Sequence, residues 1–151
     1  MTWYWFPDNT VLCNFAAVSR LRLLKEILRG RGRWVEAIYY EATNSARFYP
    51  ELASIGRDGW LGEPIQIRDQ AEVDLIEQVR RSVFGGSRQR PTEHLGEAQT
   101  CHVILNWPAF QGSFWVTDDR DALEYARRRG ITTRDTMDLF CEATVEGLCT
   151  Q

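Results

Sequence analysis

The sequence has very few lysines and histidines. Lys25 is the only lysine among 151 residues, His94 and His102 are the only histidines, and all remaining basic residues are arginines. A phosphoryl-transfer receiver domain, which also places acids at the ends of parallel strands, requires a lysine late in the chain. Lys25 lies near the start, so the sequence argues against that class. The small number of histidines fits a chemistry that needs no histidine nucleophile.

Cysteines are few and widely spaced. The four are Cys13, Cys101, Cys141 and Cys149, with no Cys-x-x-Cys pair among them. This spacing argues against a zinc site. Cys13, Cys101 and Cys141 fall inside apolar helical patterns, where a free cysteine usually packs as a small hydrophobic side chain. We therefore expect reduced thiols without a chemical role.

Long apolar runs are also missing. A membrane-spanning helix needs about 20 apolar residues, and Met1 to Phe15 lacks the basic start of an export signal. The net charge of −3 is mild, and the composition is that of a globular protein. We expect residues 1–151 to form a single domain, located in the cytoplasm without contact to a membrane.

Short apolar runs alternate with helical patterns along the chain. Strands are expected at five places: 3–7, 34–38, 64–67, 114–117 and 130–132, the second of which could instead lead directly into a helix. Helices are expected at 9–18, 21–28, 40–52, 70–83, 95–106, 119–129 and 135–146. The alternation predicts an α/β fold, a three-layer α/β/α arrangement with a mainly parallel central sheet of about five short strands.

Acidic residues occupy the junctions between these expected elements. They are Asp8, Glu41, Glu97, Asp118 and Asp119. Sites in open parallel sheets form outside the carboxyl ends of the strands, where Asp8 and Asp118 are expected, and Glu41 and Glu97 near helix starts could lean over the same crevice. Each acid alone could be a helix cap or a solvated turn residue. Together they could supply the oxygen ligands that Mg²⁺ or Mn²⁺ prefers.

Four stretches of the sequence resemble the PIN-domain ribonucleases, and the resemblance covers nearly the entire chain. Residues 6–12 are similar to the opening strand with its first acid, and residues 40–42 to the helical acid. Residues 94–98 (HLGEA) are similar to the third acidic station, and residues 114–120 to the last strand with its Thr-x-Asp turn. Two features depart from the family pattern: Glu97 stands where aspartate is commoner, and the segment from Pro50 to Glu63 is longer and richer in glycine.

This resemblance implies a Mg²⁺- or Mn²⁺-dependent endoribonuclease that cleaves single-stranded RNA. It further implies a homodimeric toxin neutralised by an antitoxin protein, as in VapC-like toxins. Asp8, Glu41 and Glu97 would be metal ligands together with Asp118 or Asp119, between which the sequence does not decide. Thr117 could hydrogen-bond a ligand carboxylate and Arg120 could bind the scissile phosphate, although Arg120 could equally be a surface helix residue.

Two further alternatives stay open in the sequence. The chain could be a PIN-like module that has lost catalysis and binds RNA or protein, although all acidic stations are filled. The apolar residues Phe48, Tyr49, Leu52, Trp60 and Leu61 could form a groove for an antitoxin helix, or simply pack against the domain. The second interpretation is the simpler one for these apolar residues. Trp107, Phe110, Phe114 and Trp115 could stack on RNA bases, although packing under the sheet is the simpler interpretation for Phe114 and Trp115. His94 is expected to be an exposed or capping residue outside the site.

Overall fold

The computed structural model describes residues 3–149, and within them the chain has three strands and eight α-helices. The strands are β1 (Trp5–Pro7), β2 (Phe114–Val116) and β3 (Thr132–Arg134). The helices are α1 (Asn9–Ala17), α2 (Leu21–Leu28), α3 (Glu36–Ser45), α4 (Ala53–Asp58), α5 (Gln70–Ser82), α6 (Leu95–Asn106), α7 (Arg120–Arg128) and α8 (Thr136–Val145). Short 3-10 turns at Pro50–Leu52 and Pro108–Phe110 complete these elements.

The sheet is parallel throughout, with the order β1-β2-β3. Phe6 lies opposite Trp115, and Trp115 lies opposite Thr133. Parallel strands need long crossover connections, which the chain provides as helices between successive strands. The α/β class and the parallel sheet are therefore as the sequence predicts.

The expected number of about five strands is wrong for the described residues. The segments at 34–38 and 64–67 share only one isolated parallel bridge, between Val35 and Ile65, and a second isolated bridge joins Gly32, just before the first segment, to Trp5 of β1. One reason is local sequence: α3 begins at Glu36, directly after Val35, and leaves no length for a strand. The apolar residues of both segments are buried, Trp34, Val35, Ile65 and Ile67 in irregular chain and Ala37 and Ile38 in α3. The first segment thus leads directly into a helix, which is the alternative that the sequence left open.

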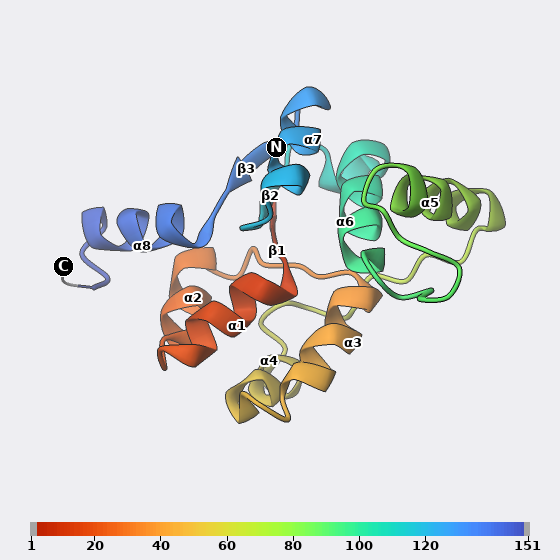
Figure 1. The fold of residues 1–151 in the computed structure, drawn as a ribbon. Coiled ribbons are helices and arrows are strands. Elements are labelled where there is room, and N and C mark those ends of the chain that lie inside the picture. The colour runs from red at the N-terminus through yellow and green to blue at the C-terminus, as the bar shows by residue number, and fades with distance from the viewer. Residues whose placement is uncertain (1–2, 150–151) are drawn as a thin grey trace.

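Helices flank the sheet on both sides (Figure 1). Helices α1, α2 and α8 lie on one side, and α5 and α6 lie on the other, with α3 and α4 below the sheet. One hydrophobic cluster joins these layers through large apolar side chains such as Phe15, Leu24, Ile55 and Trp115. Long-range packing of this kind, more than helix propensity, stabilises helices of eight to thirteen residues.

Helix ends agree with the sequence patterns in most places. Asp69 caps α5 by accepting the Glu72 backbone N–H, and Asp135 caps α8 in a reciprocal pair with Asp138. The expected helix at 40–52 is wrong in its bounds: α3 starts at Glu36 and ends at Ser45, and a turn precedes the next helical segment. Glu41 consequently sits in the middle of a helix and not at its start.

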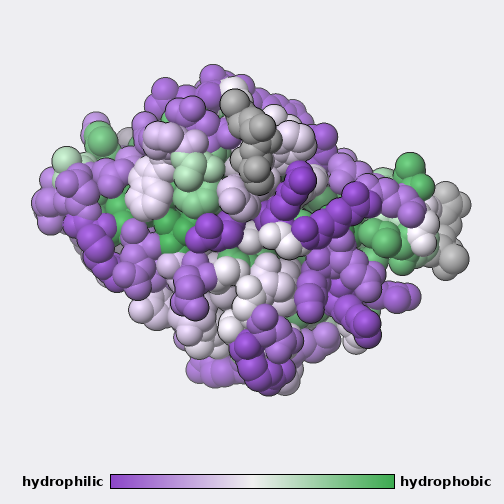
Figure 2. Space-filling view, turned by 180° about the vertical axis from the view of Figure 1, so that it is seen from behind, coloured by the Kyte–Doolittle hydropathy of each residue, from purple (hydrophilic) through white to green (hydrophobic). Residues whose placement is uncertain are grey.

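The apolar residues considered for an antitoxin groove are mostly packed. Leu52 and Leu61 are buried, Tyr49 and Trp60 are half-buried, and only Phe48 is well exposed. Hydrophilic residues cover much of the face in Figure 2, and apolar residues appear both on its left half and at the right end, which carries α8. Met137 and Val145 of α8 are exposed. None of the described helices is long and apolar enough to cross a membrane.

A buried arginine organises the loop between α5 and α6. Arg80 is 1% exposed, and its guanidinium forms a two-pronged pair with Glu77 at 2.6 and 2.7 Å. The same group donates to the backbone carbonyls of Ser87, Arg90 and Glu93 at 3.0 to 3.1 Å. These bonds fix the loop that leads into the first turn of α6.

Replacement of Arg80 by leucine should therefore destabilise the fold. The substitution leaves three loop carbonyls without a donor, and losing a buried hydrogen-bonded charge of this kind costs about 3 kcal/mol. Urea denaturation of Arg80→Leu and of the exposed neighbour variant Arg81→Leu measures the difference. A loss below about 1 kcal/mol for Arg80→Leu, or an equal loss for both variants, would contradict this role.

Candidate functional site

Asp8 stands at the carboxyl end of β1, in the position before the first residue of α1. Its backbone N–H donates to the Val116 carbonyl, which continues the sheet by one step. The side chain does not cap α1. Instead Asp8 Oδ1 accepts the indole N–H of Trp115 at 2.9 Å, because Phe6, Asp8 and Trp115 alternate onto one face of the sheet. Capping therefore does not account for this acid.

The carboxyl group of Asp8 is 7% exposed and carries a strongly shifted pKa. Burial raises the pKa of Asp8 to about 8, against hydrogen bonds from Thr117 and Trp115 that favour the charged form. The nearby carboxylates of Glu97 and Glu41 raise it further. A buried carboxyl surrounded by other carboxyls keeps its proton near neutral pH unless a cation compensates the charge.

Glu97 lies in the first turn of α6, where the sequence placed it. Its Oε1 is 3.2 Å from Nδ1 of His94, while Oε2 is buried and has no hydrogen-bond partner within residues 3–149. Burial raises the pKa of Glu97, His94 lowers it, and Asp119 and Asp121 raise it. An unpartnered buried carboxylate oxygen is costly, which makes this atom the strongest local indication of a missing ligand.

Glu41 reaches the same region from the middle of α3. Burial and the charge of Glu97 raise the pKa of Glu41 to about 7, while His94 and the backbone N–H of Gly96 lower it. The close approach of α3 to α6 depends on Gly96, because a Cβ at that position would lie 3.0 Å from Glu41 Oε1 and would collide with Ile38. Glycine in the Leu-Gly-Glu-Ala stretch thus lets α3 and α6 meet beside the acids.

The neighbouring acids Asp118 and Asp119 have different environments. Asp118 turns toward the side of α1 and α8, where its two oxygens accept from the Thr136 backbone N–H, the Thr136 hydroxyl and the Asn14 amide at 2.6 to 2.8 Å. Asp119 caps α7 with Oδ1 and is close enough to Glu97 to raise its pKa. The electrostatic effect on Glu97 therefore groups Asp119, and not Asp118, with the other acids.

Thr117 contacts both Asp8 and Asp119. The buried Thr117 hydroxyl accepts the Asp119 backbone N–H at 3.2 Å, and it also hydrogen-bonds the Asp8 carboxyl. Arg120, the next residue after Asp119, is exposed and has no ion pair within the described chain. Thr117 thus hydrogen-bonds one of the acids, and the exposed Arg120 side chain is accessible to a ligand.

We call Asp8, Glu41, Glu97 and Asp119 the acidic cluster. Their mutual effects on pKa place them in one region at the carboxyl edge of the sheet. As the side chains stand, however, no three His, Cys, Asp or Glu residues among those described are close enough together to hold one metal ion. The donor set is all carboxylate, as Mg²⁺ and Mn²⁺ prefer, and the unpartnered Glu97 oxygen fits such an ion.

Two residues of this region were not assigned to it from the sequence. Trp115 was expected to pack under the sheet, and it is fully buried, but its indole N–H also fixes Asp8. His94 was set aside as an exposed or capping residue, yet its ring lies against Glu97 and also 3.4 Å from Glu93. The spacing of three residues between His94 and Glu97 at a helix start was the available signal.

Comparisons with known proteins identify no relative of this chain: no family model, no curated protein and no solved structure matches it.

The shifted pKa values of Asp8 and Glu41 predict a pH-dependent stability in metal-free buffer. Both pKa values lie above the ordinary values of 3.8 for aspartate and 4.5 for glutamate. At pH values between these ordinary pKa values and about 8, the folded chain therefore binds more protons than the unfolded chain. Stability should fall as the pH rises through 7 and 8. We expect a loss on the order of 2 kcal/mol, or about 5 °C in Tm, between roughly pH 6 and 8.5.

Thermal unfolding of the parent and of Asp8→Asn across this range, with chelator present, tests the expectation. The amide cannot ionise, so the variant should lose much less stability with rising pH and be the more stable protein at high pH. The same pH dependence in both proteins would rule out Asp8 as the source.

Proposed function

We propose that this protein is a Mg²⁺- or Mn²⁺-dependent endoribonuclease that hydrolyses phosphodiester bonds in single-stranded RNA. The observation that carries the proposal is the acidic cluster, in which burial and neighbouring carboxylates raise the pKa of Asp8, Glu41 and Glu97 and one buried oxygen of Glu97 lacks a partner within the described residues. Crowding of carboxylates is unfavourable by itself and becomes favourable with a divalent cation. The resemblance to PIN-domain ribonucleases supports the same activity.

In this proposal the residues around the cluster have three roles: metal binding, orientation of the ligands and phosphate contact. Asp8, Glu41, Glu97 and Asp119 would hold the ion, directly or through water. A bound ion would lower the pKa of a water molecule and neutralise charge on the phosphate. Trp115 and Thr117 orient the Asp8 carboxyl, and His94 orients Glu97 by occupying one of its oxygens. The exposed Arg120 would contact the phosphate beside the cluster.

A second candidate is a PIN-like module without catalysis that binds RNA or protein. One observation favours it: among the residues described, the acids do not yet stand within the distances of a single metal site. The two candidates differ in metal binding. Titration calorimetry with Mn²⁺ gives saturable heat for the nuclease and none for the module.

The wider biological role in the proposal follows from the resemblance alone. As a VapC-like toxin, the protein would act as a homodimer and would be neutralised by an antitoxin protein. Sedimentation of the purified chain measures the first of these properties directly.

RNA cleavage should depend on both metal and Asp8. We expect the purified protein to cut a pooled single-stranded RNA with Mn²⁺ and not with EDTA. The Asp8→Asn variant should cut at a rate lower by more than about 100-fold, because it loses a charged metal ligand. Asp74→Asn, an exposed acid on α5, is the matched control and should cut like the parent. A folded protein that neither binds Mn²⁺ nor cuts the RNA would move the assignment to the binding module.

Substitution of Asp118 should mainly lower stability, whereas substitution of Asp119 should mainly lower activity. Asp119→Asn keeps a good helix cap and should fold normally but lose cleavage, since it removes the charge near Glu97. Asp118→Asn places an amide against the Asn14 amide and the Thr136 hydroxyl, and it should cost about 2 kcal/mol while the remaining folded protein still cuts RNA. Urea denaturation and cleavage at low temperature measure both effects. The reverse pattern would make Asp118 the ligand.

A further inference from the structure

Phe48 is the most exposed aromatic side chain among residues 3–149. It lies in the turn that follows α3, and 75% of its surface is exposed. A single exposed apolar side chain is common on protein surfaces, so its neighbours have to show whether the ring serves a ligand.

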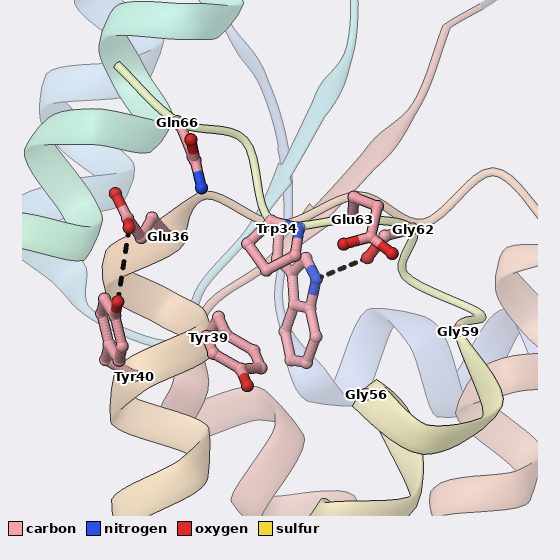
Figure 3. Close-up of a pocket in the computed structure, with 10 residues that line it drawn as sticks. Trp34, Glu36, Tyr39, Tyr40, Gly56, Gly59, Gly62, Glu63 and Gln66 are labelled. Carbon is pink, nitrogen blue, oxygen red and sulfur yellow. Dashed lines mark hydrogen bonds between the residues drawn. The ribbon is translucent and has the colours of Figure 1, made fainter. Parts of the chain in front are cut away.

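The two aromatic side chains within α3 have partners in the fold. Figure 3 shows Tyr39 beside Trp34, and Tyr40 beside Glu36. The Tyr39 and Trp34 rings meet edge to face with centroids 5.3 Å apart, and the Tyr40 hydroxyl donates to Glu36 at 3.4 Å. Among the described residues, Phe48 pairs with no other aromatic ring. Packing inside the domain therefore does not account for the Phe48 ring.

A cation lies against Phe48. The Arg47 guanidinium is over the Phe48 ring, 5.9 Å from its centroid. It donates to the Asn44 carbonyl at 3.4 Å, and within the described chain it forms no ion pair. Exposed aromatic rings with arginines beside them bind the bases and phosphates of single-stranded nucleic acids. We call these two residues the Arg-Phe pair.

The Arg-Phe pair lies next to the acidic cluster. Asn9, the residue after Asp8, donates from its side-chain amide to the Ser45 hydroxyl at 2.9 Å. Ser45 stands four residues beyond Glu41 on α3, which is about 6 Å along the helix axis. The Ser45 carbonyl accepts the Phe48 backbone N–H at 2.9 Å. A strand with one phosphate at the acidic cluster therefore has its neighbouring nucleotides beside the pair.

The surroundings of the pair fit one base better than the apolar helix of a protein partner. A helix that binds in a groove requires a row of apolar positions on the receiving surface. Near Phe48 such a row is missing from the described surface, because Leu52 and Leu61 are buried and Tyr49 and Trp60 are half-buried. One exposed ring offers the area of one base.

We propose that Phe48 stacks on a base of the RNA substrate, with Arg47 beside the ring, and so holds the strand across the acidic cluster. The inference rests on the proposed function, because it takes single-stranded RNA as the ligand. Every base has a flat face, so this contact adds affinity for the strand and little choice of sequence.

RNA binding measured apart from cleavage tests the contact. Fluorescence anisotropy follows a short fluorescein-labelled RNA of random sequence on the full chain with Mn²⁺, in the Asp8→Asn background to suppress cleavage. Adding Phe48→Leu keeps an apolar side chain without a ring, and it should weaken binding about 10-fold. Phe48→Tyr keeps the ring and should leave the affinity unchanged. Because Phe48 is exposed, both substitutions should leave the Tm unchanged.

Trp3→Leu in the same background is the matched control. Trp3 is also exposed, and the Arg31 guanidinium lies 5.5 Å from its ring centroid. It precedes β1, however, and so stands at the edge of the sheet opposite to Asp8. This variant should bind RNA as the background protein does. Unchanged affinity of Phe48→Leu, equal losses in Phe48→Leu and Trp3→Leu, or no saturable RNA binding at all would each overturn the proposal.

Cleavage by chains that keep Asp8 separates this inference from the nuclease assignment. Phe48→Leu should raise KM about 10-fold and leave kcat nearly unchanged, because stacking is the same in the ground state and the transition state. Binding that depends on Phe48 in a protein that cuts no RNA would refute the nuclease and support the stacking contact. Cleavage by Phe48→Leu with the parent KM would refute the stacking contact and support the nuclease.

Discussion

The constraint on which the site depends is the burial of the Asp8 carboxyl beside other carboxyls. A buried acid needs hydrogen bonds or a cation, and Asp8 has two donors, Trp115 and Thr117, that hold it without neutralising it. Its pKa of about 8 means that the empty protein keeps a proton there at neutral pH. The fold thus tolerates the acid as a neutral group, and a divalent ion would release that proton on binding.

The parallel register decides which acids join Asp8. Side chains alternate across a strand, so Thr117 follows Trp115 onto the face of Asp8, and Asp118 points to the opposite face. There Asp118 anchors the first turn of α8 and the side chain of Asn14 on α1. Adjacent residues therefore have different roles. Asp118 joins α1 to α8, whereas Asp119 raises the pKa of Glu97.

Much of this arrangement could be predicted from the sequence, and the reasons for the rest are physical. Alternating patterns predicted the α/β class, and strand ends predicted the positions of Asp8 and Asp118, while the choice between Asp118 and Asp119 stayed open. The strand at 64–67 was overestimated, and the boundary at 34–38 stayed undecided, because a short apolar run does not distinguish a strand from a buried linker or a helix start. His94 and the Trp115 N–H were missed as site groups because their partners, Glu97 and Asp8, depend on side-chain directions that spacing alone does not fix.

The packing of helix α3 against α6 positions Glu41 within the acidic cluster. Glu41 reaches the cluster from the middle of α3, beside Gly96 of α6. The contact of Ile38 with Gly96 leaves no space for α3 to approach α6 further, since even a methyl group at Gly96 would overlap Ile38. A side chain at position 96 would therefore push the two helices apart and separate Glu41 from Glu97, because a close-packed interior has no spare volume to absorb it.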